Sequence, residues 1–268
     1  MFFSFFLYLP YFLTNAQEKV AVHDFRVVNT YPHSKQDFTQ GFLVKGNSIY
    51  QSTGLYGRSE LQHLHLTNNT KIKSKALNKK HFGEGLTEWN NKLFQLTWKE
   101  NVMMVYDINT FDLIETVKYP AALKEGWGIC SDGTYLYISD GSHKIYVMNP
   151  ADYSIIKTIL VTSLGQRITR INELEWVDGE IWANIWYAHY IIRIDPSTGK
   201  INSWVNLTGL EQDGEYSSWN AGEVLNGIAY DNGKIYVTGK NWAHIYEIEL
   251  GKITVLEQIP INSRKDLK

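Results

Sequence analysis

Residues 81–87 read His-Phe-Gly-Glu-Gly-Leu-Thr, and the tripeptide at the centre of this segment has four counterparts elsewhere in the chain. In each copy, a short polar or glycine-containing tripeptide leads into an apolar segment. The five copies are Gln40-Gly41-Phe42, Glu84-Gly85-Leu86, Trp127-Gly128-Ile129, Asn172-Glu173-Leu174 and Asn226-Gly227-Ile228. Their first residues lie 44, 43, 45 and 54 positions apart. A repeat of this length indicates several copies of one supersecondary unit within a single domain.

The sequence after each tripeptide alternates turns with strand-like segments. In the third copy, residues 135–140 and 144–148 are rich in Ile, Tyr and Val, which favour strands. The dipeptides Asp132-Gly133, Asp178-Gly179 and Asn232-Gly233 are typical of two-residue hairpin turns, in which both residues have positive φ. No segment shows a convincing apolar period of 3.6 residues over the length of a helix. Four short strands in each repeat are typical of a propeller blade, so we predict an all-β fold, a five-bladed β-propeller.

The two ends of the repeat array predict how it closes. Residues 19–33 resemble the last strand of a repeat, but no first three strands precede them. We expect this lone strand to pair with the blade formed by the C-terminal end of the chain, because closure removes the exposed edges of an open array. Residues 207–223 explain the longest spacing, and we expect them to form a loop before the fifth copy. In a closed ring, Gln40, Glu84, Asn172 and Asn226 would converge, because they occupy equivalent positions in their copies.

Composition excludes some functions and cofactors. A formal net charge of -2 gives no electrostatic footprint for nucleic acid or for an anionic membrane. The single cysteine, Cys130, excludes an intramolecular disulfide and a metal site built from cysteines, and we expect it to be buried and inert. His63 and His65 lie on one face of a predicted strand, but no third ligand accompanies them, so we interpret them as structural. We expect no catalytic metal and no cofactor.

The N-terminal residues predict export. Residues 2–13 are apolar and too short to span a bilayer comfortably, and Thr14-Asn15-Ala16 places small residues before a cleavage site at Gln17. No Lys or Arg precedes the apolar run, which is unusual for a signal peptide. We interpret residues 1–16 as a signal peptide and residues 17–268 as one propeller domain, periplasmic or secreted. We expect no membrane insertion after removal of the signal peptide, and a monomer.

Motifs distributed over the repeats carry a family resemblance. They are Phe38-Thr39-Gln40-Gly41, Ser52-Thr53-Gly54-Leu55-Tyr56-Gly57, Phe82-Gly83-Glu84-Gly85-Leu86-Thr87, Leu96-Thr97-Trp98-Lys99, Glu125-Gly126-Trp127-Gly128, Asn172-Glu173-Leu174-Glu175 and Thr238-Gly239-Lys240-Asn241-Trp242. Together they resemble the plant and bacterial glutaminyl cyclases (glutamine cyclotransferases). These are five-bladed propellers that convert N-terminal glutamine to pyroglutamate with loss of ammonia. The resemblance covers residues 20–250. Two positions depart from it: Gln51, where the family usually has Glu, and Ala243, where it usually has Pro.

The resemblance implies peptide or protein substrates that begin with glutamine, and a general acid and base at Glu84. A carboxylic residue could take a proton from the attacking α-amine and return it to the departing nitrogen. Glu84 lies between two glycines, which let the backbone approach a ligand closely. It could instead be a turn carboxylate, in which case Glu125 or Glu173 would be the alternative base.

The resemblance also implies roles for amide, ammonium and aromatic groups. Asn172 and Lys240 would stabilise the charge that develops on the γ-carbonyl oxygen, and Gln40 could hold the substrate's backbone amide. Each could instead be structural, Asn172 and Gln40 as turn residues and Lys240 as a surface lysine. The predicted pocket walls are Phe38, Phe82, Trp98, Trp127 and Trp186. Without the resemblance, each of these aromatic side chains would be interpreted as packing between blades. The other tryptophans are left as core or rim, namely Trp89, Trp176, Trp182, Trp204, Trp219 and Trp242.

Two other functions compete with cyclisation. Propellers often serve as non-catalytic binding or scaffold modules, here in the cell envelope, because a fold does not determine a function. A glycoside hydrolase of five blades would need two opposed carboxylates. The starts of the repeats offer Glu84 but mainly amides elsewhere, which argues against that chemistry.

Overall fold

The computed structural model describes residues 18–210 and 223–261, and these residues form strands connected by turns and loops. Three consecutive parts of the chain each form a four-stranded antiparallel sheet. The first sheet contains β2 (Thr39–Lys45), β3 (Ser48–Thr53), β4 (Glu60–His65) and β5 (Lys71–Ala76). The second contains β6 (Gly83–Trp89), β7 (Lys92–Thr97), β8 (Val102–Asp107) and β9 (Leu113–Lys118). The third contains β10 (Ile129–Ser131), β11 (Leu136–Ser139), β12 (Lys144–Met148) and β13 (Ile155–Leu160).

The remaining strands form one sheet of eight strands and one small hairpin. One half of the larger sheet contains β16 (Ile171–Val177), β17 (Glu180–Ile185), β18 (Tyr190–Ile194) and β19 (Ile201–Asn206). The other half contains β20 (Leu225–Asp231), β21 (Lys234–Gly239), β22 (His244–Leu256) and β1 (Val20–Pro32). The hairpin consists of β14 (Thr162–Ser163) and β15 (Gln166–Arg167). The predicted all-β class is confirmed. Within the described ranges, no helix is long and apolar enough to cross a membrane.

β1 joins the start of the chain to its end. It pairs with β22 in antiparallel fashion from Val20, opposite Leu256, to Pro32, opposite His244. The predicted pairing of the N-terminal strand with the last strand is therefore present. β1 also makes a short parallel contact with β19, where Val22 lies opposite Trp204. This contact merges the two halves into one eight-stranded sheet.

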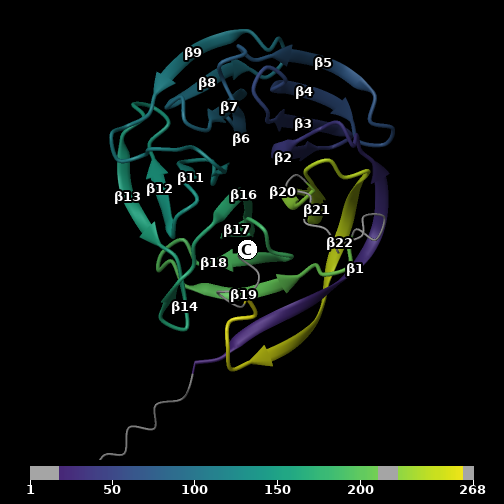
Figure 1. Ribbon diagram of the computed structural model, residues 1–268, viewed down its shortest axis with the longest axis vertical. Coiled ribbons are helices and arrows are strands. Elements are labelled where there is room, and N and C mark those ends of the chain that lie inside the picture. Colours follow the sequence, from purple (N-terminus) through teal and green to yellow (C-terminus); the bar gives the residue numbers. More distant parts are fainter. Residues whose placement is uncertain (1–17, 211–222, 262–268) are drawn as a thin grey trace, which may run out of the picture.

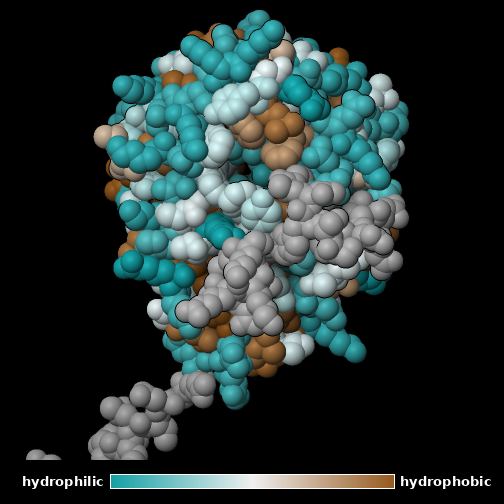
Figure 2. Space-filling view, viewed as in Figure 1, coloured by the Kyte–Doolittle hydropathy of each residue, from teal (hydrophilic) through white to brown (hydrophobic). Residues whose placement is uncertain are grey.

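The first strands of the sheets meet around a common centre (Figure 1). β2 contacts both β6 and β20, β6 contacts β10, β10 contacts β16, and β16 contacts β20. The last strands, among them β5, β9 and β13, lie at the periphery of the same view. Figure 2 shows that this face is mostly hydrophilic, with separate apolar patches. The repeated tripeptides, which start the first strands, are thus brought together.

The inner strands approach one another too closely for side chains at the repeated glycines. A Cβ on Gly85 would lie 2.7 Å from the carbonyl oxygen of Trp127, and one on Gly128 would lie 2.1 Å from the carbonyl oxygen of Asn172. The same approach lets the Gly85 N–H donate to the Trp127 carbonyl oxygen at 2.7 Å. Glycine is therefore required at these positions by the contact between sheets.

Glu173 occupies the glycine position of the fourth copy, and its side chain reaches the neighbouring inner strands. Its carboxyl group accepts the Ile228 N–H at 2.9 Å and also the N–H of Phe42. The residue is 1% exposed, and its Oε1 has no hydrogen-bond partner among the described residues. Burial, and then the nearby Glu175, raise the pKa of Glu173 well above its usual range. Glu173 therefore connects three inner strands, which is a structural use of the carboxyl group.

Two of the three predicted hairpin turns have the expected backbone. Asp178-Gly179 and Asn232-Gly233 have positive φ at both residues. The prediction is wrong for Asp132, because only Gly133 has positive φ there. Asp132 Oδ1 accepts the N–H groups of Thr134 and Tyr135 at 2.7 and 2.6 Å, so this connection is a longer turn closed by the aspartate side chain.

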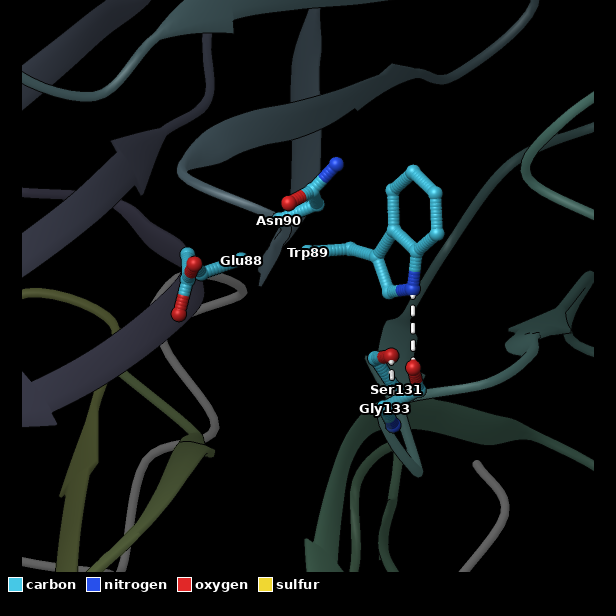
Figure 3. Close-up of a pocket in the computed structure, with 5 residues that line it drawn as sticks. All are labelled: Glu88, Trp89, Asn90, Ser131 and Gly133. Atoms are coloured by element: carbon cyan, nitrogen blue, oxygen red, sulfur yellow. Dashed lines mark hydrogen bonds between the residues drawn. The ribbon is translucent and has the colours of Figure 1, made fainter.

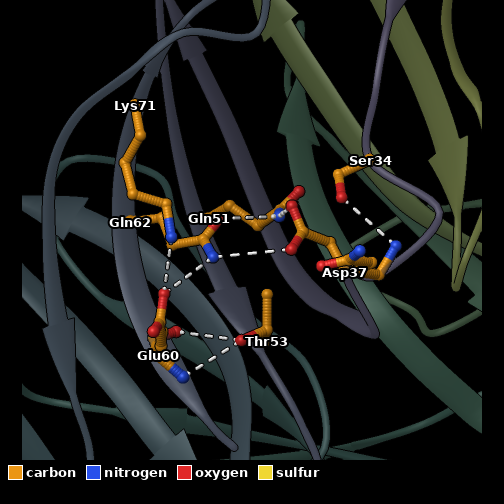
Figure 4. Close-up of polar contacts among 8 residues, drawn as sticks. Ser34, Asp37, Gln51, Thr53, Glu60, Gln62 and Lys71 are labelled. Carbon is orange, nitrogen blue, oxygen red and sulfur yellow. Dashed lines mark hydrogen bonds and ion pairs between the residues drawn. The ribbon is translucent and has the colours of Figure 1, made fainter.

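Gln51 lies in a buried polar network next to the start of β2 (Figure 4). Its Nε2 donates to Asp37 at 3.0 Å and to Gln62 at 3.3 Å, while its Oε1 contacts His33 Nε2 at 2.8 Å. His33 Nδ1 lies 3.0 Å from the carbonyl oxygen of Trp242. An amide serves here as both donor and acceptor, whereas an ionised carboxylate could only accept.

We expect Glu173→Gln to gain stability relative to the wild type as pH rises. The raised pKa means that the folded wild type keeps its proton where the unfolded chain releases it, so its stability falls as pH rises above the unfolded value, by at most about 1.4 kcal/mol per unit. Glutamine keeps the acceptor for Ile228 and does not ionise. Urea unfolding at pH 5 and pH 8 measures the difference. The exposed Glu249→Gln is the control, and an equal offset at both pH values would contradict the assignment.

We expect Gln51→Glu to destabilise the protein at neutral pH by about 1–3 kcal/mol, because a donor to Asp37 becomes a second carboxylate. The loss should shrink as pH falls, since one of the two carboxyl groups then takes up a proton. Denaturant unfolding at pH 5 and pH 8 measures this. Unchanged stability at both pH values would contradict this account of the Gln51 network.

Candidate active site

Glu84 and Lys240 form the charged centre of the candidate site. Glu84 lies on β6 and is 5% exposed; Lys240 directly follows β21 and is 4% exposed. Burial raises the pKa of Glu84 well above its usual range, Glu100 and Glu125 add to this, and Lys240 opposes it. Burial lowers the pKa of Lys240 to about 8, against the opposing effect of Glu84. The two groups thus interact electrostatically, but no direct ion pair joins either of them to another described residue.

A repeated irregularity in the inner strands places the polar residues. The pairing of β6 with β7 shifts register between Gly83 and Leu86, which spans Glu84. The same shift spans Gln40 in β2, Asn172 in β16 and Asn226 in β20. A bulge of this kind leaves residues outside the regular ladder and redirects their side chains. The equivalent positions inferred from sequence therefore share one local geometry.

The three amides at these positions are used differently. Asn172 is 2% exposed; its carbonyl oxygen accepts a hydrogen bond from Ser139 Oγ at 2.7 Å, and its side chain has no hydrogen bond to another described residue. Asn226 donates to the carbonyl oxygen of Thr39 at 2.9 Å and to Gln40 Oε1 at 3.4 Å. The Asn172 side-chain amide is thus unengaged by the described residues, whereas the Gln40 oxygen faces Asn226.

One group of aromatic rings lies beside Lys240. The Lys240 Nζ is 4.9 Å from the ring centre of Phe38. Phe38 makes an edge contact with Phe82 at 6.2 Å, and Phe82 in turn contacts Trp98 at 5.6 Å and Tyr56 at 5.3 Å. Three of the predicted wall residues therefore form one chain of contacts that ends at the buried ammonium group.

A second aromatic group contains the other two predicted wall residues. Trp127 and Trp186 lie perpendicular at 5.3 Å, and Tyr187 adjoins Trp186 at 4.4 Å. Glu125 connects the two groups, because its Oε2 accepts the indole N–H of Trp98 at 2.8 Å and that of Trp127 at 3.0 Å. Glu125 is thus engaged by both indoles, and Glu173 by backbone N–H groups. This leaves Glu84 as the buried carboxyl group without a hydrogen-bond partner among the described site residues.

Sequence reasoning missed Glu100, Tyr56 and Tyr187 as site residues. Glu100 accepts the Tyr56 hydroxyl at 2.8 Å and the Phe82 N–H at 3.2 Å. Tyr56 was within a motif quoted for the resemblance and could have been chosen from it. Glu100 and Tyr187 carry no comparable signal, since their places depend on how separate loops meet.

The remaining sequence predictions concern residues that lie outside the candidate site. Cys130 is fully buried, and burial raises the pKa of its thiol well above the usual range, so it is an inert core residue as predicted. His63 stacks on Tyr50 at 4.5 Å, which agrees with a structural role. In residues 18–210 and 223–261, no group of three His, Cys, Asp or Glu side chains could hold a metal ion. The tryptophans that lie in the core are Trp182, Trp204 and Trp242, and Trp219 lies outside the described residues.

A separate pocket lies at the other end of β6 (Figure 3). Its volume is about 490 Å³, and it is lined by Glu88, Trp89, Asn90, Ser131 and Gly133. The Trp89 indole donates to the carbonyl oxygen of Gly133 at 3.0 Å, which connects two neighbouring hairpins. This pocket does not contain the Glu84 and Lys240 pair.

Comparison with known proteins identifies the family. The chain is 37% identical over 233 residues to a glutaminyl-peptide cyclotransferase of Arabidopsis thaliana, covering 85% of this chain and 72% of that protein. It also resembles the crystal structure of Myxococcus xanthus glutaminyl cyclase, with a TM-score of 0.79, 30% identity, and coverage of 88% of this chain and 99% of that chain. A family model described as glutamine cyclotransferase matches residues 6–250. The chain therefore belongs to the glutamine cyclotransferase family.

Proposed function

We propose that this protein cyclises N-terminal glutamine of peptides or proteins to pyroglutamate, releasing ammonia, and that its sheets form a five-bladed β-propeller. Family membership supports the activity, and the closed sequence of contacts among β2, β6, β10, β16 and β20 supports the architecture. The observation that carries the proposal is the buried pair of Glu84 and Lys240, which interact without a direct ion pair. Because the two side chains do not neutralise each other in a direct ion pair, both can interact with a polar ligand.

The reaction needs one proton to move twice. The α-amine nitrogen attacks the γ-carboxamide carbon and forms the ring C–N bond, while Glu84 takes a proton from that nitrogen. The negative charge on the former carbonyl oxygen is stabilised by the Lys240 ammonium and the Asn172 amide. Glu84 then returns the proton to the former amide nitrogen, the bond from carbon to that nitrogen breaks, and ammonia leaves. The raised pKa of Glu84 suits a group that must both accept and donate near neutral pH.

The aromatic side chains would hold the aliphatic part of the glutamine and exclude water. Phe38, Phe82 and Trp98 would form one wall, and Trp127 and Trp186 the other. The dispersion and desolvation that they provide do not distinguish the transition state from the ground state, so their main effect would be on binding.

Export of the protein is a further part of the proposal. Its support is the apolar run at residues 2–13 followed by small residues before Gln17. These residues lie outside the described ranges. We propose that the mature protein acts in the periplasm or outside the cell, as a monomer.

We expect Glu84→Gln to lower kcat by about 10²–10⁴-fold on a peptide that begins with glutamine, because the amide cannot relay the proton. Ammonia release followed with a coupled assay measures the effect. Glu115→Gln, an outer-strand change whose carboxylate accepts only the Tyr153 hydroxyl among the described residues, is the control. Undiminished turnover by Glu84→Gln would favour a different base, and no turnover by the wild type would favour a binding module. Wild-type activity that a chelator abolishes would show that a metal is required.

We expect the alkaline limb of the pH profile to depend on Lys240. Its pKa of about 8 means that the ammonium is lost as pH rises past that value, so kcat should fall there. Lys240→Arg keeps its charge at high pH, so the limb should disappear from the residual activity. Steady-state kinetics from pH 5 to pH 10 measure this. An unchanged alkaline limb in Lys240→Arg would assign that limb to another group.

A further inference from the structure

Glu125 connects two walls of the site through a single oxygen atom. Trp98 follows β7 of the second sheet and Trp127 precedes β10 of the third, yet both indoles donate to Glu125 Oε2, at 2.8 and 3.0 Å. We propose that Glu125 is a positioning residue that fixes the relative orientation of these two indoles and thereby the shape of the pocket for the glutamine side chain. This inference rests on the proposed function.

The chemistry of the donors and of the acceptor explains why the two hydrogen bonds would fix the orientation of the indole rings. An indole has a single N–H donor, so the acceptor that it finds determines how the ring is rotated. A hydrogen bond to an ionised acceptor is roughly twice as strong as a neutral one. Because both bonds end on one oxygen, a displacement or loss of the Glu125 carboxylate removes the acceptor of both rings at once.

The backbone around Glu125 is itself closely packed. A Cβ on Gly126 would lie 2.2 Å from the Tyr119 hydroxyl oxygen, and the Gly126 N–H donates to the Trp98 carbonyl oxygen at 3.1 Å. The Trp127 ring lies against Gly141, where a Cβ would be 2.6 Å from the ring. The chain at residues 125–127 therefore has little freedom, and the carboxylate is held where both indoles can reach it.

Glu125 also acts on Glu84 through its charge. Together with Glu100 it disfavours the ionised form of Glu84, in the same direction as burial. Glu100 makes different contacts, because it accepts from Tyr56 and from the Phe82 backbone and not from an indole. Glu100 is therefore a matched comparison that has the charge without the bonds to the two tryptophans.

The test is a double-mutant cycle on a peptide that begins with glutamine. We expect Glu125→Ala to lower kcat/KM by about 10- to 100-fold in the wild-type background. The displaced Trp98 and Trp127 rings would no longer hold the glutamine side chain in its reactive orientation. In a Trp98→Phe, Trp127→Phe background, which has no indole donors, the same change should cost only a few-fold. Glu125→Gln, of the same size and with an acceptor oxygen, should recover part of the loss.

The pH profile separates positioning from general damage to the fold. Removing a negative charge lets Glu84 ionise at lower pH, so the acid limb of kcat/KM should move to lower pH in both Glu125→Gln and Glu100→Gln. Only the Glu125 change should be coupled to the two tryptophans. Circular dichroism and thermal unfolding of each variant check folding, and Glu125→Gln remains informative if Glu125→Ala is unfolded.

The outcomes are distinct. Equal costs of the Glu125 change in both tryptophan backgrounds, or wild-type kcat/KM in Glu125→Ala, would overturn the positioning role while leaving the proposed function in place. An acid limb that moves in Glu100→Gln but not in Glu125→Gln would overturn the electrostatic part. A wild-type protein that releases no ammonia would overturn the proposed function, and this inference with it.

Discussion

The hydrogen bond from the Gly85 N–H to the Trp127 carbonyl oxygen joins the inner strands of two different sheets. It forms because Gly85 has no side chain, since a Cβ there would lie 2.7 Å from the same carbonyl oxygen; Gly128 in turn permits the next contact, with Asn172. Contacts of this kind determine how closely the first strands approach, and hence how far apart the residues next to the glycines lie. Glu84 precedes one of these glycines, so the position of the candidate base follows from a backbone contact.

The bulge at the start of the inner strands places two carboxyl groups, those of Glu173 and Glu84, in different surroundings. At Glu173, the side chain points to backbone N–H groups, including that of Ile228, and becomes part of the framework. At Glu84, no described residue donates a hydrogen bond to the carboxyl group, which interacts instead with the charge of Lys240. Both groups are buried and both have a raised pKa, so burial alone does not identify the base. The difference lies in whether the hydrogen-bonding capacity is already used.

Much of this arrangement was predictable because it is local or periodic. The repeat, the strand-forming segments and the lone N-terminal strand follow from patterns within short windows, and the structure has the corresponding strands and the β1–β22 pairing. The shared bulge explains why equivalent sequence positions indicated Glu84 and Asn172. The roles of Glu125, Glu100 and Gln51 were not predictable in this way. Their partners lie in separate loops or strands, and only the packed chain determines which groups meet.

Proton transfer provides a reason for burying Glu84 beside other carboxylates. A substrate α-amine has a pKa of about 7.7–8.0, so an ordinary glutamate, near 4.3, would be a poor match. Each unit of mismatch costs about 1.4 kcal/mol in transferring the proton, or about 5 kcal/mol in total. Burial, with the charges of Glu100 and Glu125, raises the pKa of Glu84 toward that of the amine. Lys240 opposes this shift, and in the proposed mechanism its charge would stabilise the oxyanion. The acidic neighbours therefore let one site keep both a basic carboxylate and a cation.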